Sequence, residues 1–537
     1  MYKNIFIKPF NCFCSSNILL KEKKSSNIKK LCTSVDNISK WKEPVGYNTG
    51  IEIYNCVAKK KVPLILRNKN LATWYTCGPT VYAPAHIGHA VCYLNVDILQ
   101  RVLRNYFDIN LITVLGITDV DDKIINRARE QGELHSVLAK RYENEFLSEI
   151  KAFNISPSHM IARVTDYIPH IISFTQKLLS YGQAYKSEGG SIYFATKDYD
   201  KYGKLENIKL DNKKQEGKEF ASDFALWKGA KENEPYWEAP WGKGRPGWHI
   251  ECSTMASHLL GRVVDIHAGG IDLRFPHHEN EEAQSCAYHD CDQWVNYWIH
   301  TGHLQMKDSG KMSKSLKNTI SISEFLKKYS PDVLRTACLL SHYRSHMVYS
   351  ESFMDHASAI YKKIHTFLTD CTAYTNGIKP RVDIDEAYLF YQVDIMNKSI
   401  EESLKDDFDT AKCMSSILSL IDIVNKIINS NKSSNQNYII AQNCCIIAMI
   451  QSSIEKHLKL FGMQMYEEKT TANIDYTSIL NSVVQVRDDI RQIALKENRK
   501  SMFEFCDKIR NDLKALGIEI KDHGKASSWS FVNQKNN

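Results

Sequence analysis

The sequence predicts an α/β fold built on a parallel sheet and followed by a helical C-terminal third. Two features predict it. Before about residue 330, short apolar runs typical of strands alternate with helical segments and glycine-containing loops. Beyond that point, apolar residues recur almost entirely at helical spacing, which is typical of a helix bundle. At 537 residues the chain is too long for one compact core, so we expect about three or four domains.

A strand–helix–strand unit is predicted near the start of the α/β part. Residues 71–77 and 109–115 are expected to form two buried strands, and residues 91–106 the helix between them. The helix would place four residues on one face: Leu94, Ile98, Val102 and Tyr106. A right-handed crossover makes the two strands parallel and places a ligand at their carboxyl ends. A further strand is predicted over 263–270.

The composition excludes several classes of protein. Apolar residues make up 43% and charged residues 24%, as in ordinary globular proteins. No apolar run approaches the roughly 18 residues of a transmembrane helix, so we expect no membrane association. The 15 cysteines are odd in number and scattered, which argues against a disulfide scaffold and for reduced thiols. The net charge of +7 permits a polyanionic partner without requiring one.

The first 45 residues differ from the rest and are predicted to be a mitochondrial transit peptide. Residues 1–40 contain eight lysines against only Glu22 and Asp36, together with serines and apolar patches. Such peptides favour arginine, and this segment has none. A disordered basic tail is the alternative, in which case a cytoplasmic location would be expected instead of the mitochondrial matrix.

Two motifs are suited to a nucleotide. In His86-Ile87-Gly88-His89, the glycine lets a base or ribose approach the backbone, and the helix that follows offers free N–H groups to phosphate. In the stretch 308–318, Lys311 and Lys314 stand among small residues and could neutralise a leaving pyrophosphate. Either motif alone is weak evidence, because a solvated basic loop is common.

A metal site can be assembled from four residues far apart in the chain. His277 and Glu281 are four residues apart, so on a helix they would face one ion. Cys77 and Cys252 would add two thiolates, and this mixed set suits zinc. Spacing alone does not establish the site, since no CxxC pair is present and a lone buried cysteine usually belongs to a core.

In this order, the tetrad and the Lys-Met-Ser-Lys-Ser run at 311–315 resemble those of class I aminoacyl-tRNA synthetases. The loop ITDVDDKI at 117–124 also matches that family. Four further stretches resemble cysteinyl-tRNA synthetases in particular: CGPTVY, GWHIECS, DIHAGG and FPHHENE. The match runs from about residue 50 to residue 330.

This resemblance implies a Rossmann-like catalytic core that activates L-cysteine with ATP and Mg²⁺ and transfers it to tRNA(Cys). It implies one Zn²⁺ per chain, held by Cys77, Cys252, His277 and Glu281. It assigns ATP binding and catalysis to His86, Gly88, His89, Lys311 and Lys314. It assigns the cysteine pocket to Gly78, Thr118, Trp248 and His267. Two positions depart from the family, which usually has asparagine at Gly116 and glycine at Ala268.

The resemblance also implies a domain order. The catalytic domain is expected over 46–330 with a connective insertion at 155–235, a helical bundle over 331–470 and a small anticodon-binding module over 471–537. Basic and aromatic residues of that module could contact tRNA: Arg487, Arg491, Lys508, Arg510 and Trp529. The Ser-Ser-Trp-Ser run around Trp529 lacks the arginine that the family has there.

Two other hypotheses compete with a tRNA ligase, and one side activity could accompany it. Relatives that share this catalytic domain join cysteine to a small amine, but they are shorter and lack a helical third. A cysteine persulfide-forming side activity is known in the family and has no independent sign in this sequence. A non-catalytic nucleic-acid-binding paralogue would be expected to have lost motifs that are all present here. We expect a monomer.

Overall fold

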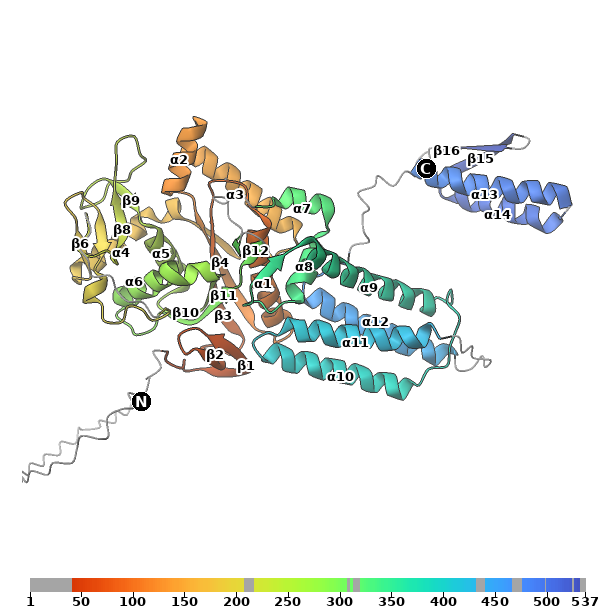
Figure 1. The fold of residues 1–537 in the computed structure, drawn as a ribbon, viewed down its shortest axis with the longest axis horizontal. Helices are drawn as coiled ribbons and strands as arrows, with labels where there is room; N and C mark the ends of the chain where they lie inside the picture. The colour runs from red at the N-terminus through yellow and green to blue at the C-terminus, as the bar shows by residue number, and fades with distance from the viewer. Residues whose placement is uncertain are drawn as a thin grey trace, which may run out of the picture.

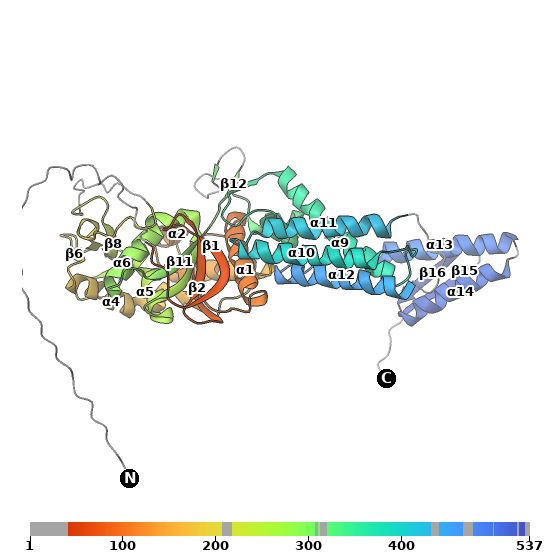
Figure 2. The same ribbon diagram turned by 90° about the horizontal axis from the view of Figure 1, so that it is seen from below.

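The structure is a computed structural model, which describes residues 41–206, 217–306, 310–311, 319–430, 440–465, 476–497, 499–523 and 526–531. A mixed α/β part, a bundle of long helices and a small C-terminal module follow one another along the molecule (Figures 1 and 2). The predicted transit peptide therefore lies almost wholly outside the described residues. Trp41 and Lys42 are described, and both bond to the segment 293–296 of the α/β part.

Five parallel strands form the central sheet, in the order β11-β10-β3-β4-β5. They are β3 (Leu71–Thr80), β4 (Asn110–Thr118), β5 (Met160–Arg163), β10 (Val264–Gly270) and β11 (Val295–Thr301). The strands are largely buried, as expected for a parallel sheet covered on both faces. The predicted parallel α/β fold is thus confirmed.

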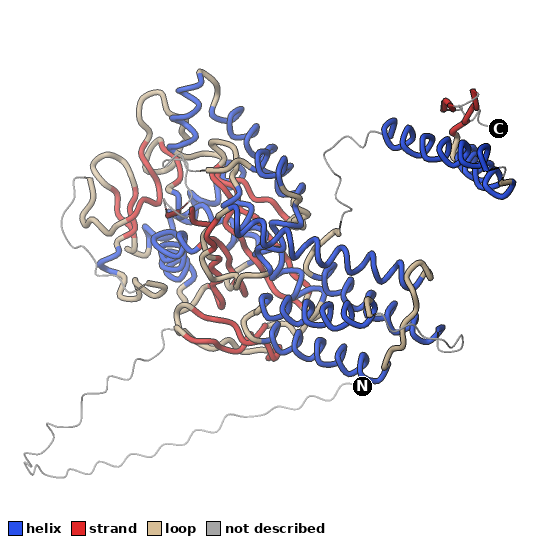
Figure 3. Tube along the Cα trace, turned by 45° about the vertical axis from the view of Figure 1, so that its right-hand side comes forward, coloured by secondary structure: helices blue, strands red, loops and turns tan. Residues whose placement is uncertain are grey.

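Helices cover both faces of this sheet (Figure 3). The helix α1 (Ile87–Asn105) connects β3 to β4 and begins four residues before the predicted start, at the histidine–glycine tetrad. On the other face lie α5 (Trp248–Leu260) and α6 (Glu279–His289), which pack against each other. The chain runs from β3 outward to β4 and β5 and then returns to place β10 on the opposite side of β3. Such a reversal leaves a crevice at the carboxyl ends of β3 and β10.

The segment between β5 and β10 carries a second sheet. After η1 (Val164–Tyr167) and α4 (Ile168–Ser180), four short strands pair antiparallel in the order β6-β7-β8-β9. They are β6 (Ala184–Lys186), β7 (Ile192–Phe194), β8 (Phe224–Gly229) and β9 (Gly244–Pro246). The sequence did not predict these strands, because each is short and polar residues surround it.

Smaller elements complete the α/β part. A hairpin of β1 (Tyr47–Asn55) and β2 (Lys60–Leu66) precedes the sheet, and α2 (Asp122–Gln131) and α3 (His135–Ala152) follow β4. Short helical turns occur at η2 (Thr196–Asp198), η3 (Ile271–Leu273) and η4 (Arg274–His278). After β11, a small sheet joins β12 (Leu304–Met306), β13 (Gly310–Lys311) and β14 (Met347–Tyr349), and α7 (Ile322–Lys328) and α8 (Pro331–Leu339) lie between its last two strands.

The helical third consists of a bundle and a terminal module. The bundle contains α9 (Glu351–Thr375), α10 (Glu386–Lys405), α11 (Thr410–Ile428) and α12 (Ile440–Leu460). The module contains α13 (Tyr476–Glu497), α14 (Lys500–Ala515) and an antiparallel hairpin of β15 (Ile518–His523) and β16 (Ala526–Phe531). The sequence did not predict this hairpin. No helix in the described part of the chain is long and apolar enough to span a membrane.

A buried arginine, paired with an aspartate of the α/β part, connects that part to the bundle. Arg335 of α8 and Asp97 of α1 are almost completely buried and lie 2.7 Å apart. The same guanidinium donates to the carbonyl oxygens of Phe153 and Phe461, at 2.8 and 3.1 Å. Since Phe461 directly follows α12, one side chain connects the end of the bundle to the helix that begins at the tetrad.

We predict that Arg335→Met lowers the free energy of unfolding by about 3–5 kcal/mol, because it leaves the Asp97 carboxylate buried with one partner fewer. Urea unfolding followed by circular dichroism measures the change. The control is Arg101→Met, which removes the second arginine paired with Asp97, a partly exposed one, and should cost less. Equal stability of Arg335→Met and wild type would contradict this role.

Candidate active site

A cavity of about 460 Å³ opens at the carboxyl ends of the central strands. The reversal of strand order between β3 and β10 predicts a ligand site there. It lies between the end of β3, the start of α1 and the start of α5. Its lining includes most of the residues that the sequence proposed for the two substrates and the metal: Cys77, Gly78, His86, Gly88, His89, Thr118, Trp248, Cys252 and His277.

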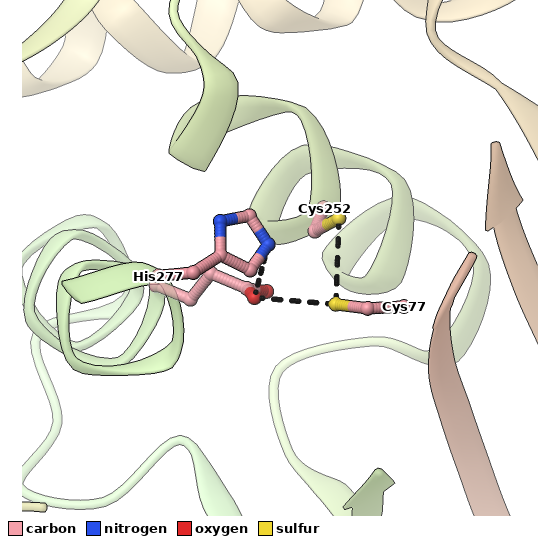
Figure 4. Close-up of side chains that lie close together, drawn as sticks. Cys77, Cys252 and His277 are labelled. Atoms are coloured by element: carbon pink, nitrogen blue, oxygen red, sulfur yellow. Dashed lines mark hydrogen bonds and ion pairs between the residues drawn. The ribbon is translucent and has the colours of Figure 1, made fainter. Parts of the chain in front are cut away.

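The four proposed ligand side chains converge on one location beside this cavity. Figure 4 shows three of them, Cys77, Cys252 and His277, close together. The Sγ atoms of Cys77 and Cys252 lie 3.7 Å apart, and Cys77 Sγ lies 3.6 Å from Oε1 of Glu281. Nε2 of His277 lies 3.0 Å from the same carboxylate oxygen. All four donor atoms fall within 4.8 Å of one another, and all four residues are buried.

This spacing fits a zinc ion. Two sulfurs that are each about 2.3 Å from a tetrahedral zinc lie about 3.8 Å apart, close to the separation of the two thiols here. The donor set of two thiols, one imidazole and one carboxylate is also one that zinc accepts. The four residues present therefore fit the metal that the family resemblance implies.

The charges within the cluster are strongly coupled. The hydrogen bond from the Cys77 thiol lowers the pKa of Cys252 to about 6, against the effect of burial. Burial opposes protonation of His277, but the Glu281 carboxylate and Cys252 raise its pKa to about 10. Burial likewise opposes ionisation of Glu281, but His267 and His277 lower its pKa to about 2. Cys252 and Glu281 are thus held ionised, whereas burial raises the pKa of the Cys77 thiol well above its usual value, so a metal would displace protons from both Cys77 and His277.

A shell of rings supports the cluster, and these rings are buried apart from the exposed Trp248. Nε2 of His267 lies 3.1 Å from Oε2 of Glu281, and Nδ1 of His249 lies 3.0 Å from Nδ1 of His277. Trp248 stacks on the His277 ring at a centroid distance of 4.3 Å. His267 therefore lies behind Glu281, and it is not among the residues that line the cavity, although the sequence placed it in the cysteine pocket.

A second ligand set overlaps the first. His267 and His278 come within 4.8 Å of Cys77 and Glu281, so these four could also surround an ion. Two residues are shared, so both sets mark one location. The first set has two thiols instead of one, which suits zinc better. Burial lowers the pKa of His278 well below its usual value, so this imidazole is neutral.

The tetrad lines the same cavity. His86 immediately precedes α1, and its backbone N–H donates to Nδ1 of His89 at 3.2 Å. The two imidazoles stack at a centroid distance of 3.8 Å. Gly88 lies in the first turn, where the positive end of the helix dipole favours phosphate. This part of the cavity is suited to an anion.

Most of the lysine-rich motif lies outside the described residues, and this includes Lys314. Lys311 belongs to β13, whose backbone pairs with β12. The strand β12 follows directly on the segment Gly302–His303, which lines the cavity. The first residue of the motif, Lys311, therefore lies on a strand that pairs beside the cavity.

Close backbone packing explains one of the predicted pocket glycines. A Cβ atom on Gly78 would lie 1.9 Å from the carbonyl oxygen of Gly116 on β4, so only glycine lets the end of β3 approach β4 here. On the same strand β4, Thr118 lines the cavity and donates to Oε2 of Glu251 at 3.0 Å. Ala268 is fully buried within the sheet.

In the terminal module, one of the proposed tRNA contacts is corrected. Arg487 is completely buried, donates twice to Asp522 of the hairpin at 2.8 and 3.2 Å, and also donates to the carbonyl oxygen of Cys506. Its guanidinium thus holds α13, α14 and the hairpin together and does not face solvent. Lys508 is exposed, and Trp529 is half-buried, with its ring N–H on Asn481. Arg491 and Arg510 are partly exposed and pair with Asp522.

Several groups around the site were missed by the sequence interpretation, and all of them are buried except Asp272. Tyr75, Glu251 and His300 belong to this surrounding layer, and Asp272 lines the cavity after β10. Asp272 could have been found because it follows a predicted strand at its carboxyl end. The others carry no signal in the sequence, since they reach the site only through the packing of strands and helices.

Solved structures support the fold. A methionyl-tRNA synthetase from Mycobacterium tuberculosis matches with a TM-score of 0.56 at 14% identity, covering 73% of this chain and 92% of that chain. An arginyl-tRNA synthetase from Campylobacter jejuni, described as putative in its title, matches with a TM-score of 0.52 at 13% identity, covering 74% and 94%. At these identities the matches establish a shared fold.

Sequence comparisons identify the family. Residues 64–359 match the family model described as "tRNA synthetases class I (C) catalytic domain". "Probable cysteine--tRNA ligase, mitochondrial" of Xenopus tropicalis is 39% identical over 529 residues, covering 92% of each chain. "Cysteine--tRNA ligase, cytoplasmic" of Dictyostelium discoideum is 36% identical over 536 residues, covering 92% of this chain and 80% of the relative. The chain therefore belongs to the class I aminoacyl-tRNA synthetases, in the family of the cysteine–tRNA ligases.

Proposed function

We propose that this chain is an enzyme that ligates L-cysteine to tRNA(Cys). It activates cysteine with ATP to cysteinyl-adenylate, releases pyrophosphate, and transfers the cysteinyl group to the 3′ end of the tRNA. The observation that carries the proposal is one cavity that is lined both by a thiol-rich cluster and by a helix N-terminus suited to phosphate. The amino acid and ATP can then meet within this cavity, where the carboxylate attacks the α-phosphate.

Selection of cysteine rests on the cluster. We propose that Cys77, Cys252, His277 and Glu281 hold one Zn²⁺ per chain, with His267 orienting Glu281 from behind. A bound zinc would coordinate the substrate thiolate, for which a serine hydroxyl is a poor replacement at neutral pH. An apolar pocket would discriminate such small groups by only about 1–3 kcal/mol.

Activation rests on the part of the cavity that the tetrad lines. His86 and His89 can donate hydrogen bonds to phosphate oxygens, and the N-terminus of α1 adds its dipole. ATP would enter with Mg²⁺, which neutralises part of its charge. We propose that Lys311 and Lys314 balance the charge that builds up on the departing pyrophosphate.

We further propose that the C-terminal module contributes to tRNA binding. After the correction for Arg487, the candidates are Arg491, Lys508, Arg510 and Trp529. Lys508 offers a solvated cation to the phosphate backbone, and the indole of Trp529 offers a face on which a base could stack. A monomeric state stays a prediction.

The lysine-rich first 40 residues support a proposal that the enzyme acts in the mitochondrial matrix. The relatives include both a mitochondrial and a cytoplasmic enzyme, so the location rests on the composition of that segment. Fusion of the segment to a fluorescent protein would test it. A diffuse cytoplasmic signal would support the alternative location.

The proposed activity predicts cysteine-dependent exchange of pyrophosphate into ATP. We expect rapid exchange with cysteine, negligible exchange with serine, and loss of the cysteine signal after treatment with a zinc chelator. Charging of a tRNA(Cys) transcript separates tRNA ligation from ligation to a small amine. Absence of exchange with cysteine in the presence of zinc and magnesium would reject the proposal.

Replacing a ligand should affect metal and substrate together. We predict that Cys252→Ser lowers bound zinc from about one ion per chain to a small fraction and raises the KM for cysteine, because a hydroxyl is a poor zinc ligand. Elemental analysis and exchange kinetics measure both. The control is Cys371→Ser, which alters an equally buried cysteine in α9, far along the chain from the site. Unchanged zinc content in Cys252→Ser would reject the assignment.

Replacing the second lysine of the motif should slow adenylate formation without weakening cysteine binding. We predict that Lys314→Ala reduces the rate of adenylate formation by roughly 10²–10³-fold, because it removes a charge aimed at the transition state. Cysteine affinity should stay at the wild-type value, since the motif serves pyrophosphate. Single-turnover kinetics separate the two quantities. A wild-type adenylation rate would contradict the assigned role.

A further inference from the structure

One buried hydroxyl beside the thiol cluster has no assigned task. Tyr75 lies on β3, is completely buried, and its hydroxyl has no hydrogen-bond partner in the described part of the chain. Leaving a buried hydroxyl unpaired costs about 1–3 kcal/mol. A phenylalanine would fill the same space without that cost, so the hydroxyl requires an explanation in terms of a partner.

Strand geometry directs this side chain toward the cluster. Tyr75 and Cys77 are two residues apart on β3, so both side chains point to the same face of the sheet. On the neighbouring strand β10, His267 is directly opposite Tyr75, and the two rings lie 5.0 Å apart. His267 in turn contacts Glu281. The tyrosine ring thus lies in the layer that supports the ligands.

The position of the hydroxyl follows from Gly116. A Cβ atom built on Gly116 would lie 2.1 Å from the Tyr75 hydroxyl oxygen and 3.4 Å from Cε of Met255. Gly116 is directly opposite Cys77 in the strand register. Met255 is three residues after Cys252 on α5, so it shares that face of the helix. The hydroxyl therefore lies between β4 and the face of α5 that carries Cys252.

A tyrosine hydroxyl carries its proton at neutral pH, so it can donate a hydrogen bond to an anionic neighbour. Both thiols become thiolates when they bind a metal.

We infer that Tyr75 is a positioning residue of the metal centre, whose hydroxyl donates a hydrogen bond to the Cys252 thiolate in the metal-loaded protein. The inference rests on the proposed zinc site and deepens it. Such a bond orients the sulfur and withdraws charge from it, which adjusts how strongly the metal holds the substrate thiolate. Gly116 takes part by leaving room for the hydroxyl, where the family usually has asparagine.

The test compares zinc affinity in wild type and in Tyr75→Phe, measured by competition with a chromogenic chelator. We expect affinity to fall by roughly tenfold or more, in the range found when outer partners of metal ligands are removed. The sulfur-to-metal absorption band of the cobalt-substituted protein should also shift. Tyr297→Phe is the matched control, because Tyr297 is a buried tyrosine of the same sheet whose hydroxyl bonds to Pro63 and Ile65 instead.

A second variant approaches the same bond from the other strand. Gly116→Ala should displace the hydroxyl and reproduce the loss of zinc affinity. Adding Tyr75→Phe to Gly116→Ala should cause little further loss, because the bond is already broken. Additive losses would mean that the two residues act separately and would overturn the role assigned to Gly116.

The outcomes distinguish this inference from the function on which it rests. Wild-type zinc affinity and an unshifted cobalt band in folded Tyr75→Phe overturn the inference alone, provided that wild type binds zinc and exchanges pyrophosphate with cysteine. Wild-type protein that binds no zinc overturns the zinc site and the inference together. A merely structural role would lower the melting temperature of Tyr75→Phe without moving the cobalt band.

Discussion

The parallel pairing of β3 with both β4 and β10 is the constraint on which the cavity depends. It brings the carboxyl ends of these strands to one edge of the sheet, at the point between β3 and β10 where the order of the strands reverses. Cys77 lies near the carboxyl end of β3, and α1 begins soon after that strand. The thiol Cys77 and the tetrad residue His86 thus belong to a single β–α connection. They are nine positions apart in the chain, which limits how far apart they can lie.

The cluster places charged and polar groups in the buried interior. Contacts with neighbouring side chains offset the cost of burying them. Glu281 is buried, but two imidazoles bond to its oxygens. Removing one member would leave the others with uncompensated charge. On the opposite face of the sheet, Arg335 and Asp97 repeat the same pattern, where they connect α1 to the helical bundle. Buried polar contacts therefore lie on both faces of the central sheet, and neither set tolerates the loss of a member.

Sequence patterns predicted what depends on local periodicity and motif. The strands near 71–77, 109–115 and 263–270 and the helix after the tetrad were predicted because apolar spacing reports burial directly. The short strands of the insertion and the terminal hairpin were missed, since a few residues carry little periodicity. The prediction that Arg487 contacts tRNA was wrong for a similar reason. Helical spacing of a cation does not show that the side chain is buried and bonded to an aspartate far along the chain, Asp522.

The sequence by itself determined the family, the candidate ligands and the two substrate motifs, because these depend on residue identity and order. Only the tertiary structure decided that Cys77, Cys252, His277 and Glu281 lie within reach of one ion, since they come from segments as much as 204 positions apart. It also decided that His267 supports Glu281 from behind and that Tyr75 and Gly116 fit together beside the thiols. Such contacts arise from strand register and helix packing, which no local pattern encodes.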